Sequence, residues 1–195
     1  MKEADFLKLP VSLPYKGNVD TFLEISKNDK GEECVITGGY CANINAIKFD
    51  DVKVTWYGMT LPNQVRSCDA LFVDEGKFYL IEFKTGKPEN FDIHRKIYDS
   101  VIALMEHGVL TLSDCRDHLQ YIVVSRHYKD IVSDSLLGYL ENGIPEPWEY
   151  NVDRQILNNW DKHEIRKLTN FLFSKVYKLS PLDFERFAKN RNWSN

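Results

Sequence analysis

The sequence predicts a mixed α/β protein in which a central mixed β-sheet is flanked by helices. Residues 70–73 and 78–83 are rich in strand formers, and the polar, glycine-containing residues 74–77 between them predict a tight turn. Residues 90–107 carry apolar side chains at helical spacing, and residues 120–125 form the short apolar run of a strand buried on both faces. A hairpin, a helix and a buried strand in this order predict a crossover from the strand 78–83 to the strand 120–125.

Before the hairpin, we expect one short helix and two further strands. Residues 18–27 predict the helix, with Asn18 or Asp20 as its N-cap. Residues 34–37 and 53–57 contain β-branched and aromatic side chains and predict strands. The elements as far as the strand 120–125 therefore follow the order helix, strands, hairpin, helix and buried strand.

After the buried strand, the pattern predicts three helices and one strand. The last helix is expected to begin directly after Pro181. The expected ranges are helices at 128–140, 160–168 and 182–188 and a strand at 171–179. We interpret the chain as one domain, residues 1–195, with a core at about 18–140 and a C-terminal extension at about 141–195.

The amino-acid composition and the net charge limit the classes of protein to which this chain can belong. Of the 195 residues, 43% are hydrophobic and 28% are charged, which is typical of a globular domain with an ordinary core. No apolar run is as long as a membrane span, and the N-terminus lacks the apolar core of a signal peptide, so we expect a cytoplasmic protein without membrane contact. A net charge of −4 argues against a loose nucleic-acid binder held by overall charge.

Several common site types are disfavoured by the sequence. The four cysteines are scattered without a Cys-x2-Cys pair, which favours reduced thiols over a zinc site or an iron–sulfur cluster. The chain contains neither a phosphate-binding Gly-x4-Gly-Lys-Ser/Thr loop nor a Gly-x-Ser-x-Gly motif, so an ATPase and an α/β-hydrolase are not expected.

The hairpin carries the strongest functional pattern. Asp69 precedes the first strand, while Glu82 and Lys84 stand near the end of the second and share one face because they are two residues apart. Ile81 and Phe83 then point to the other face, and the hairpin returns Asp69 to the side of Glu82. Two carboxylates and an ammonium group in one small patch suit a Mg²⁺-dependent phosphodiesterase. A surface hairpin with an ordinary Glu–Lys pair is the alternative.

The spacing Asp-x12-Glu-x-Lys resembles that of the PD-(D/E)xK nuclease superfamily, over roughly residues 20–130. The resemblance implies a restriction-endonuclease-like fold with an α-β-β-β-α-β core. It further implies hydrolysis of phosphodiester bonds, in DNA rather than RNA, with Mg²⁺ or Mn²⁺ as cofactor. It also implies that Asp69, Glu82 and the backbone carbonyl of Phe83 bind the metal, and that Lys84 orients or deprotonates the attacking water. Restriction, recombination, repair and phage defence are all known roles in this superfamily.

Further candidate residues come from the same resemblance. Some branches place a glutamate of the first helix near the metal, which makes Glu24 a candidate catalytic residue or else a solvated helix residue. In the exonuclease-like branch, a Gln-x3-Tyr pair occupies the helix after the hairpin, and here His94 stands in place of Gln, with Tyr98 four residues later. The expected nucleic-acid-binding residues are Lys96, Tyr98, Arg95, His94 and Arg126, with solvated helix surface and helix packing as the alternatives.

A small nuclease domain of this kind is expected to act as a homodimer or with a targeting partner. The alternative function is a catalytically inactive nuclease-fold protein that binds a protein or a nucleic acid. The acidic balance supports this alternative, and so does Cys68, which stands where the family motif carries a proline before the acid.

Overall fold

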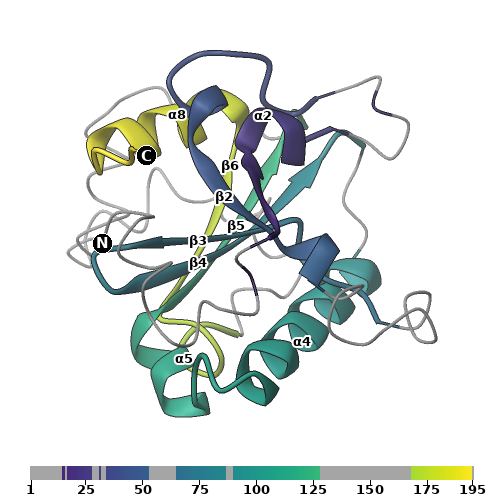
Figure 1. Cartoon of the computed structure of the whole chain (residues 1–195), viewed down its shortest axis with the longest axis vertical. Helices are drawn as coiled ribbons and strands as arrows, with labels where there is room; N and C mark the ends of the chain where they lie inside the picture. Colours follow the sequence, from purple (N-terminus) through teal and green to yellow (C-terminus); the bar gives the residue numbers. More distant parts are fainter. Residues whose placement is uncertain are drawn as a thin grey trace, which may run out of the picture.

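The computed structural model describes residues 15, 17–27, 31, 34–52, 65–86, 90–127 and 168–194. Within these residues, six strands form one mixed sheet in the order β1-β2-β3-β4-β5-β6 (Figure 1). The strands are β1 (Val19–Thr21), β2 (Asn45–Lys48), β3 (Ala70–Asp74), β4 (Lys77–Lys84), β5 (Leu119–Ser125) and β6 (Lys175–Leu179). The helices are α2 (Phe22–Ile25), the 3-10 turn η2 (Cys41–Asn43), α4 (Asn90–Glu106), α5 (Leu112–His118) and α8 (Pro181–Asn190). The predicted mixed α/β class is confirmed.

The predicted hairpin is present as β3 and β4, which pair antiparallel. Its two central turn residues, Glu75 and Gly76, have φ values of 46° and 76°. Positive φ at both positions is what a type I′ turn requires, and this turn twists in the same sense as the strands it joins. The resulting register pairs Ala70 with Ile81.

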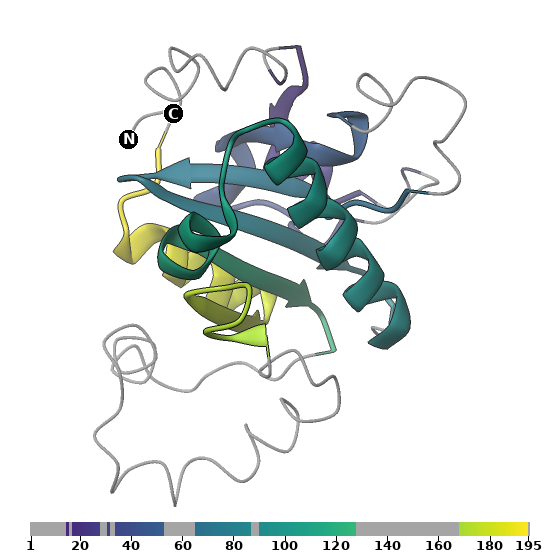
Figure 2. The ribbon, with the colours of Figure 1, turned by 90° about the horizontal axis from the view of Figure 1, so that it is seen from below.

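The predicted crossover is also present, because β4 and β5 are parallel and α4 lies between them in the chain. Figure 2 shows α4 running across one face of the sheet, with α5 beside it. The side chains with which α4 packs on this face are Ile93, Ile97, Val101 and Leu104. Every residue of β5 is buried, as expected for a strand covered on both faces. No helix of the described ranges is both long and apolar enough to cross a membrane.

Helices cover both faces of the sheet (Figure 1). Successive residues of β4 alternate between the two layers of the core: Leu80 packs with α4, whereas Ile81 and Phe83 pack with α2 and α8. We call the second layer the aromatic face. Its aromatic side chains are Phe22, Phe72, Tyr79, Phe83, Tyr177, Phe184, Phe187 and Trp193.

The predicted helix at residues 18–27 is wrong in its first half. Val19–Thr21 is the edge strand β1, paired antiparallel with β2, and only the short α2 is helical. The cap is neither Asn18 nor Asp20 but Thr21, whose Oγ1 accepts a hydrogen bond of 3.2 Å from the Glu24 N–H. The strand partner lies more than twenty residues further along the chain, so local propensity does not reveal it.

The predicted strand at residues 34–37 is also wrong. Cys34 forms an isolated bridge with Lys27, and the strand that pairs with β3 is β2, at residues 45–48. The predicted strand at 53–57 and helix at 128–140 lie outside the described residues, as does nearly all of the predicted helix at 160–168.

At the C-terminal end, β6 is parallel to β5 and begins at Lys175, later than predicted. The final helix is confirmed as α8, with Pro181 in its first turn and Ser180 as its cap. The segment expected as a C-terminal extension therefore contributes one strand to the sheet and one helix to the aromatic face. The short helix α5 was not predicted, although Thr111 and Asp114 form a capping box at its start.

Candidate active site

The hairpin register brings two carboxylates together. One step beyond the Ala70–Ile81 pair, Asp69 meets Glu82. Both accept hydrogen bonds from the same ammonium group, since Lys96 Nζ lies 3.1 Å from Asp69 Oδ1 and 2.8 Å from Glu82 Oε1. Glu82 is fully buried, and the side chain of Asp69 is 14% exposed. The structure therefore places these acids side by side, as the hairpin pattern predicts.

Lys84 joins the same group of charges, on the face of β4 that carries Glu82. Its Nζ lies 2.9 Å from Glu82 Oε1 and 3.0 Å from Oδ2 of Asp92, a residue of α4. Acids and lysines thus alternate in one continuous series, which we call the ion-pair chain. Its members, in order of contact, are Asp92, Lys84, Glu82, Lys96 and Asp69.

The two lysines approach Glu82 at the same oxygen, Oε1. The other oxygen, Oε2, is buried and has no hydrogen-bond partner among the described residues. Asp69 uses its second oxygen differently, because Oδ2 accepts a hydrogen bond of 2.6 Å from the Phe83 N–H. A buried carboxylate oxygen without a partner is costly, so Glu82 Oε2 is an acceptor that one more donor or a cation would stabilise.

Burial and mutual repulsion set the charges of the site. Burial, and then the Glu82 carboxylate, raise the pKa of Asp69 to about 7 against the opposing effect of Lys96. For Lys96, burial alone lowers the pKa, but Asp69 and Glu82 outweigh it and hold the pKa well above its usual range. Lys84 behaves alike: burial lowers its pKa, Glu82 raises it, and the net shift is upward. Both lysines are therefore ammonium ions at neutral pH.

Two residues that were predicted to belong to the site, Phe83 and Glu24, do not show the expected contacts. The contact that Phe83 makes in this site comes from its N–H, so metal binding by its carbonyl remains a prediction. Glu24 has a side chain that is 44% exposed and forms an ion pair with Lys27, which is in its own segment. Its contacts are with Lys27 and Thr21 and not with the ion-pair chain, so they give no support to a catalytic role for Glu24.

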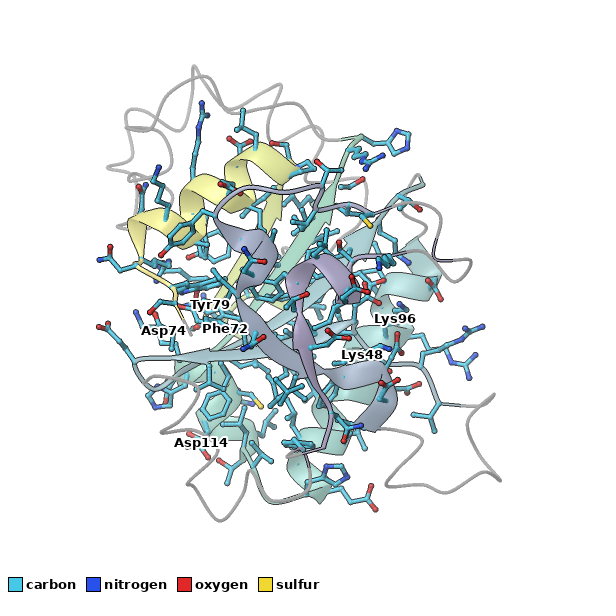
Figure 3. All side chains as sticks on the ribbon, turned by 45° about the horizontal axis from the view of Figure 1, so that its top comes forward. Lys48, Phe72, Asp74, Tyr79, Lys96 and Asp114 are labelled. Carbon is cyan, nitrogen blue, oxygen red and sulfur yellow. The ribbon has the colours of Figure 1, made fainter. Side chains whose placement is uncertain are left out.

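The candidate nucleic-acid-binding residues of α4 separate into two groups. Lys96 points to the carboxylates, and Figure 3 shows it on the opposite side of the view from Phe72 and Tyr79. Arg95 is 42% exposed and pairs with Asp99 at 3.8 Å. The rings of His94 and Tyr98 contact each other edge to face, with centroids 6.4 Å apart, and are not part of the ion-pair chain.

Arg126 follows β5 and donates a hydrogen bond to the backbone carbonyl of Cys34. This contact joins two segments far apart in the sequence, and it engages one nitrogen, Nη2, of the guanidinium group that was expected to contact nucleic acid. Phosphate binding by Arg126 remains a prediction.

The position of Lys96 was the main feature that sequence reasoning missed. Ile93 and Ile97 define the inner face of α4, and Lys96 lies between them in the sequence, next to this stripe. Four residues later Ser100 is fully buried, and its Oγ accepts a 2.8 Å hydrogen bond from the Cys68 N–H. A charged residue and a serine, four apart beside an apolar stripe, were the available signal.

The carboxylate oxygens of this site suit a hard divalent cation that binds to few protein atoms. Within the described ranges, no group of three or more His, Cys, Asp or Glu side chains is arranged to hold a metal ion. Mg²⁺ does not need three, since it keeps several waters and is commonly bound through one or two carboxylates. Asp69 and Glu82 supply two carboxylates, and Glu82 Oε2, which no described residue contacts by a hydrogen bond, is available as a ligand atom.

No protein-family description, curated protein or solved structure matches this chain. A functional proposal therefore depends on the geometry of the site and the order of the elements around it.

Proposed function

We propose that this protein is a metal-dependent nuclease of the PD-(D/E)xK type that hydrolyses phosphodiester bonds, with DNA as the expected substrate. The observation that carries the proposal is the meeting of Asp69, just before β3, with Glu82 and Lys84 of β4. One buried oxygen of Glu82 has no hydrogen-bond partner in the part of the chain that the structure describes. The element order also supports it, because β1-α2-η2-β2-β3-β4-α4-α5-β5 contains the α-β-β-β-α-β order that the sequence resemblance implies, with β1, η2 and α5 as additional elements.

Each residue of the site has a role suited to its chemistry. Asp69 and Glu82 would hold Mg²⁺ or Mn²⁺, and the Phe83 N–H fixes the orientation of the Asp69 carboxylate. A bound ion of this kind supplies Lewis acidity toward a phosphate oxygen and makes a bound water more acidic. Lys84, as an ammonium ion, donates hydrogen bonds to the water or to a phosphate oxygen and stabilises negative charge there. Asp92 holds the Lys84 side chain from the other side.

The overall charge affects how substrate reaches the site. A net charge of −4 does not attract DNA over long distances. The proposal therefore includes a second copy of the chain, or a targeting partner, that contributes to substrate binding in the cytoplasm.

A second candidate function is a nuclease-fold protein that binds a protein or nucleic acid without cutting it. The specific observation in its favour is Lys96, whose ammonium group neutralises Asp69 and Glu82 in the absence of a metal. The two candidates differ in whether a divalent ion binds at these carboxylates.

A cleavage assay tests the first candidate directly. Plasmid, linear and single-stranded DNA would be incubated with Mg²⁺ or Mn²⁺, and with EDTA as the metal-free control. Lys84→Ala should lower the cleavage rate by about 10²–10³-fold, the usual effect of removing one donor to developing charge. Lys77→Ala, at the exposed other end of β4, is the matched control and should cleave like the wild type. Cleavage that survives both Lys84→Ala and Asp69→Ala would contradict the site assignment.

Thermal melting separates the two candidates. A saturating divalent ion stabilises the protein that binds it, by about 2.7 kcal/mol at a hundred times its Kd. The wild type should therefore melt at a higher temperature with Mn²⁺, whereas Asp69→Ala should show no such shift. If the wild type neither shifts nor cleaves, the binding-module function is favoured.

A further inference from the structure

Building on this proposed function, we infer that Lys96 is a built-in competitor of the metal ion. Its ammonium group occupies the cation position between Asp69 and Glu82, and it must leave before a divalent ion binds both carboxylates. The inference adds a regulatory step to the site, namely an exchange of one cation for another.

The contacts of Lys96 are those of a bridging cation. Nζ lies 3.1 Å from Asp69 Oδ1 and 2.8 Å from Glu82 Oε1, and these oxygens come from residues on adjacent segments of the sheet. Asp69 Oδ1 and Glu82 Oε1 would hold a Mg²⁺ ion only if it took the position of Nζ in the gap between them, because Mg²⁺ requires close contact, at about 2.0–2.1 Å, with each oxygen that binds it. An ammonium group and a metal ion cannot fill this gap together, so their binding is mutually exclusive.

Lys84 does not bridge the two carboxylates. It contacts Glu82 Oε1 at 2.9 Å, but its second partner is Asp92 of α4 and not Asp69. Lys84 can therefore keep Asp92 while a metal occupies the space between Asp69 and Glu82. The exchange is specific to the lysine that bridges the two carboxylates.

Two features make Lys96 displaceable. It projects from α4, so its four methylene groups can rotate without any change in the sheet, and its side chain is 14% exposed and has access to solvent. Its ammonium group also shares Glu82 Oε1 with that of Lys84, at 2.8 Å and 2.9 Å, so the two positive charges repel each other. Departure of Lys96 relieves this repulsion.

Metal affinity in variants tests the exchange. Calorimetric titration of the full chain with Mn²⁺ would compare the wild type with Lys96→Met, which keeps the chain length and removes the charge. Hydrogen bonds between charged groups are strong enough that Lys96→Met should lower the Kd for Mn²⁺ by about tenfold or more. Lys84→Met is the matched control, because it removes one positive charge from the same oxygen of Glu82 and should change the Kd much less.

A second measurement uses the wild type, because Lys96→Met leaves two buried carboxylates without their counterion and can unfold the chain. Lysine reactivity toward an amine-labelling reagent would be followed by mass spectrometry with and without Mn²⁺. Lys96 should become more reactive with Mn²⁺, whereas Lys77, exposed in the hairpin, serves as the reference that should not change.

The outcomes separate this inference from the proposed function. If folded Lys96→Met binds Mn²⁺ no tighter than the wild type, the inference is overturned, although Mn²⁺-dependent cleavage by the wild type would still support the nuclease. If Lys96→Met binds Mn²⁺ and the wild type does not, Lys96 holds the cation position as inferred, and the nuclease proposal fails. If the variant does not fold, unchanged labelling of Lys96 overturns the inference and increased labelling supports it. If neither folded protein binds Mn²⁺, the inference is overturned as well.

Discussion

The two faces of the sheet differ most along β4, where neighbouring residues enter opposite environments. Ile81 and Phe83 pack into the aromatic face, while Glu82 and Lys84 belong to the ion-pair chain beneath α4. On one side, a strand residue contributes apolar burial and ring contacts, which stabilise the fold. On the other side, a strand residue such as Glu82 has a charge that is removed from water, and this costs free energy even when the charge is paired.

The contrast between apolar burial and buried charge indicates that the two sides of β4 have different roles. Apolar residues in place of a buried ion pair are often neutral or stabilising, so the ion-pair chain is not explained by stability. Apolar cores on both faces hold the fold together, and the part of the α4 face that carries the ion-pair chain uses some of that stability to keep two carboxylates close to each other. Substitutions on the two faces should therefore separate stability from metal binding.

The largest expected effect on stability is on the aromatic face. Trp193 is 1% exposed, and its ring centroid lies 4.4 Å from that of Phe72 and 4.8 Å from that of Tyr79. Trp193→Ala should lower the free energy of unfolding by about 3–5 kcal/mol, measured by urea denaturation. Variant protein that remains folded should keep the Mn²⁺ affinity of the wild type. Loss of both properties together would mean that the two faces are not independent.

The stability of the wild type relative to Asp69→Asn should depend on pH. This dependence shows how much stability is lost when a negative charge is buried beneath α4. Burial and the neighbouring Glu82 raise the pKa of Asp69 to about 7, so the folded protein keeps a proton that the unfolded chain releases above its ordinary pKa of 3.8. Relative to Asp69→Asn, the wild type should lose stability as pH rises from about 4 to about 7, by at most about 1.4 kcal/mol per pH unit, and then level off.

Denaturation in EDTA at several pH values measures this difference. The asparagine has one oxygen, which accepts from the Phe83 N–H, while its NH2 group replaces the oxygen that accepts from Lys96. The loss of that contact changes stability at every pH, so the slope with pH reports the titration of Asp69. A constant difference between the two proteins from pH 4 to pH 8 would contradict the raised pKa.

Helix caps on the two faces should give smaller and unequal effects. Ser180 is buried, and its Oγ both accepts from the Asp183 N–H and donates to the Asp183 carboxylate. Thr111 makes the equivalent contacts with Asp114 at the exposed start of α5. Ser180→Ala should cost about 1–2 kcal/mol and Thr111→Ala about 0.5–1 kcal/mol, both by urea denaturation. The reverse order would show that burial does not strengthen this kind of cap.

The smallest effect is expected at Arg95, one residue before Lys96 but pointing away from the site. Its 3.8 Å pair with Asp99 is exposed, and pairs of this kind contribute about 0.3–0.5 kcal/mol. Arg95→Gln should change stability by no more than this amount and leave the Mn²⁺ affinity unchanged. A large change in affinity would mean that the overall charge of α4, and not the bridge made by Lys96, controls metal binding.

Elements with a local signal were predicted correctly. The hairpin, α4 and β5 each combine a clear period or turn with suitable residue types, and their positions follow from the sequence. Residues 18–27 and 34–37 were misassigned because β1 and β2 depend on pairing with distant segments. The proximity of Asp69, Glu82 and Lys84 was predictable from strand alternation and the length of the turn.

The contacts of Lys96 could not be predicted from the sequence. A lysine on an amphipathic helix is usually assigned to solvent, and nothing in the local pattern states which side chains a helix will meet after a crossover. Its partners are 27 and 14 residues away, on the preceding segments of the sheet. The bridge depends on the docking of α4 against the hairpin, which is a tertiary property.

The two-residue turn of the hairpin, Glu75-Gly76, has one further consequence, for tolerance to insertions and deletions. Side chains of a strand alternate, so one residue added to this turn would move all later residues of β4 to the opposite face. Glu82 and Lys84 would then enter the aromatic layer, and Phe83 would lie against α4. Homologous chains that retain this site should therefore vary in many loops while the length of this turn stays the same.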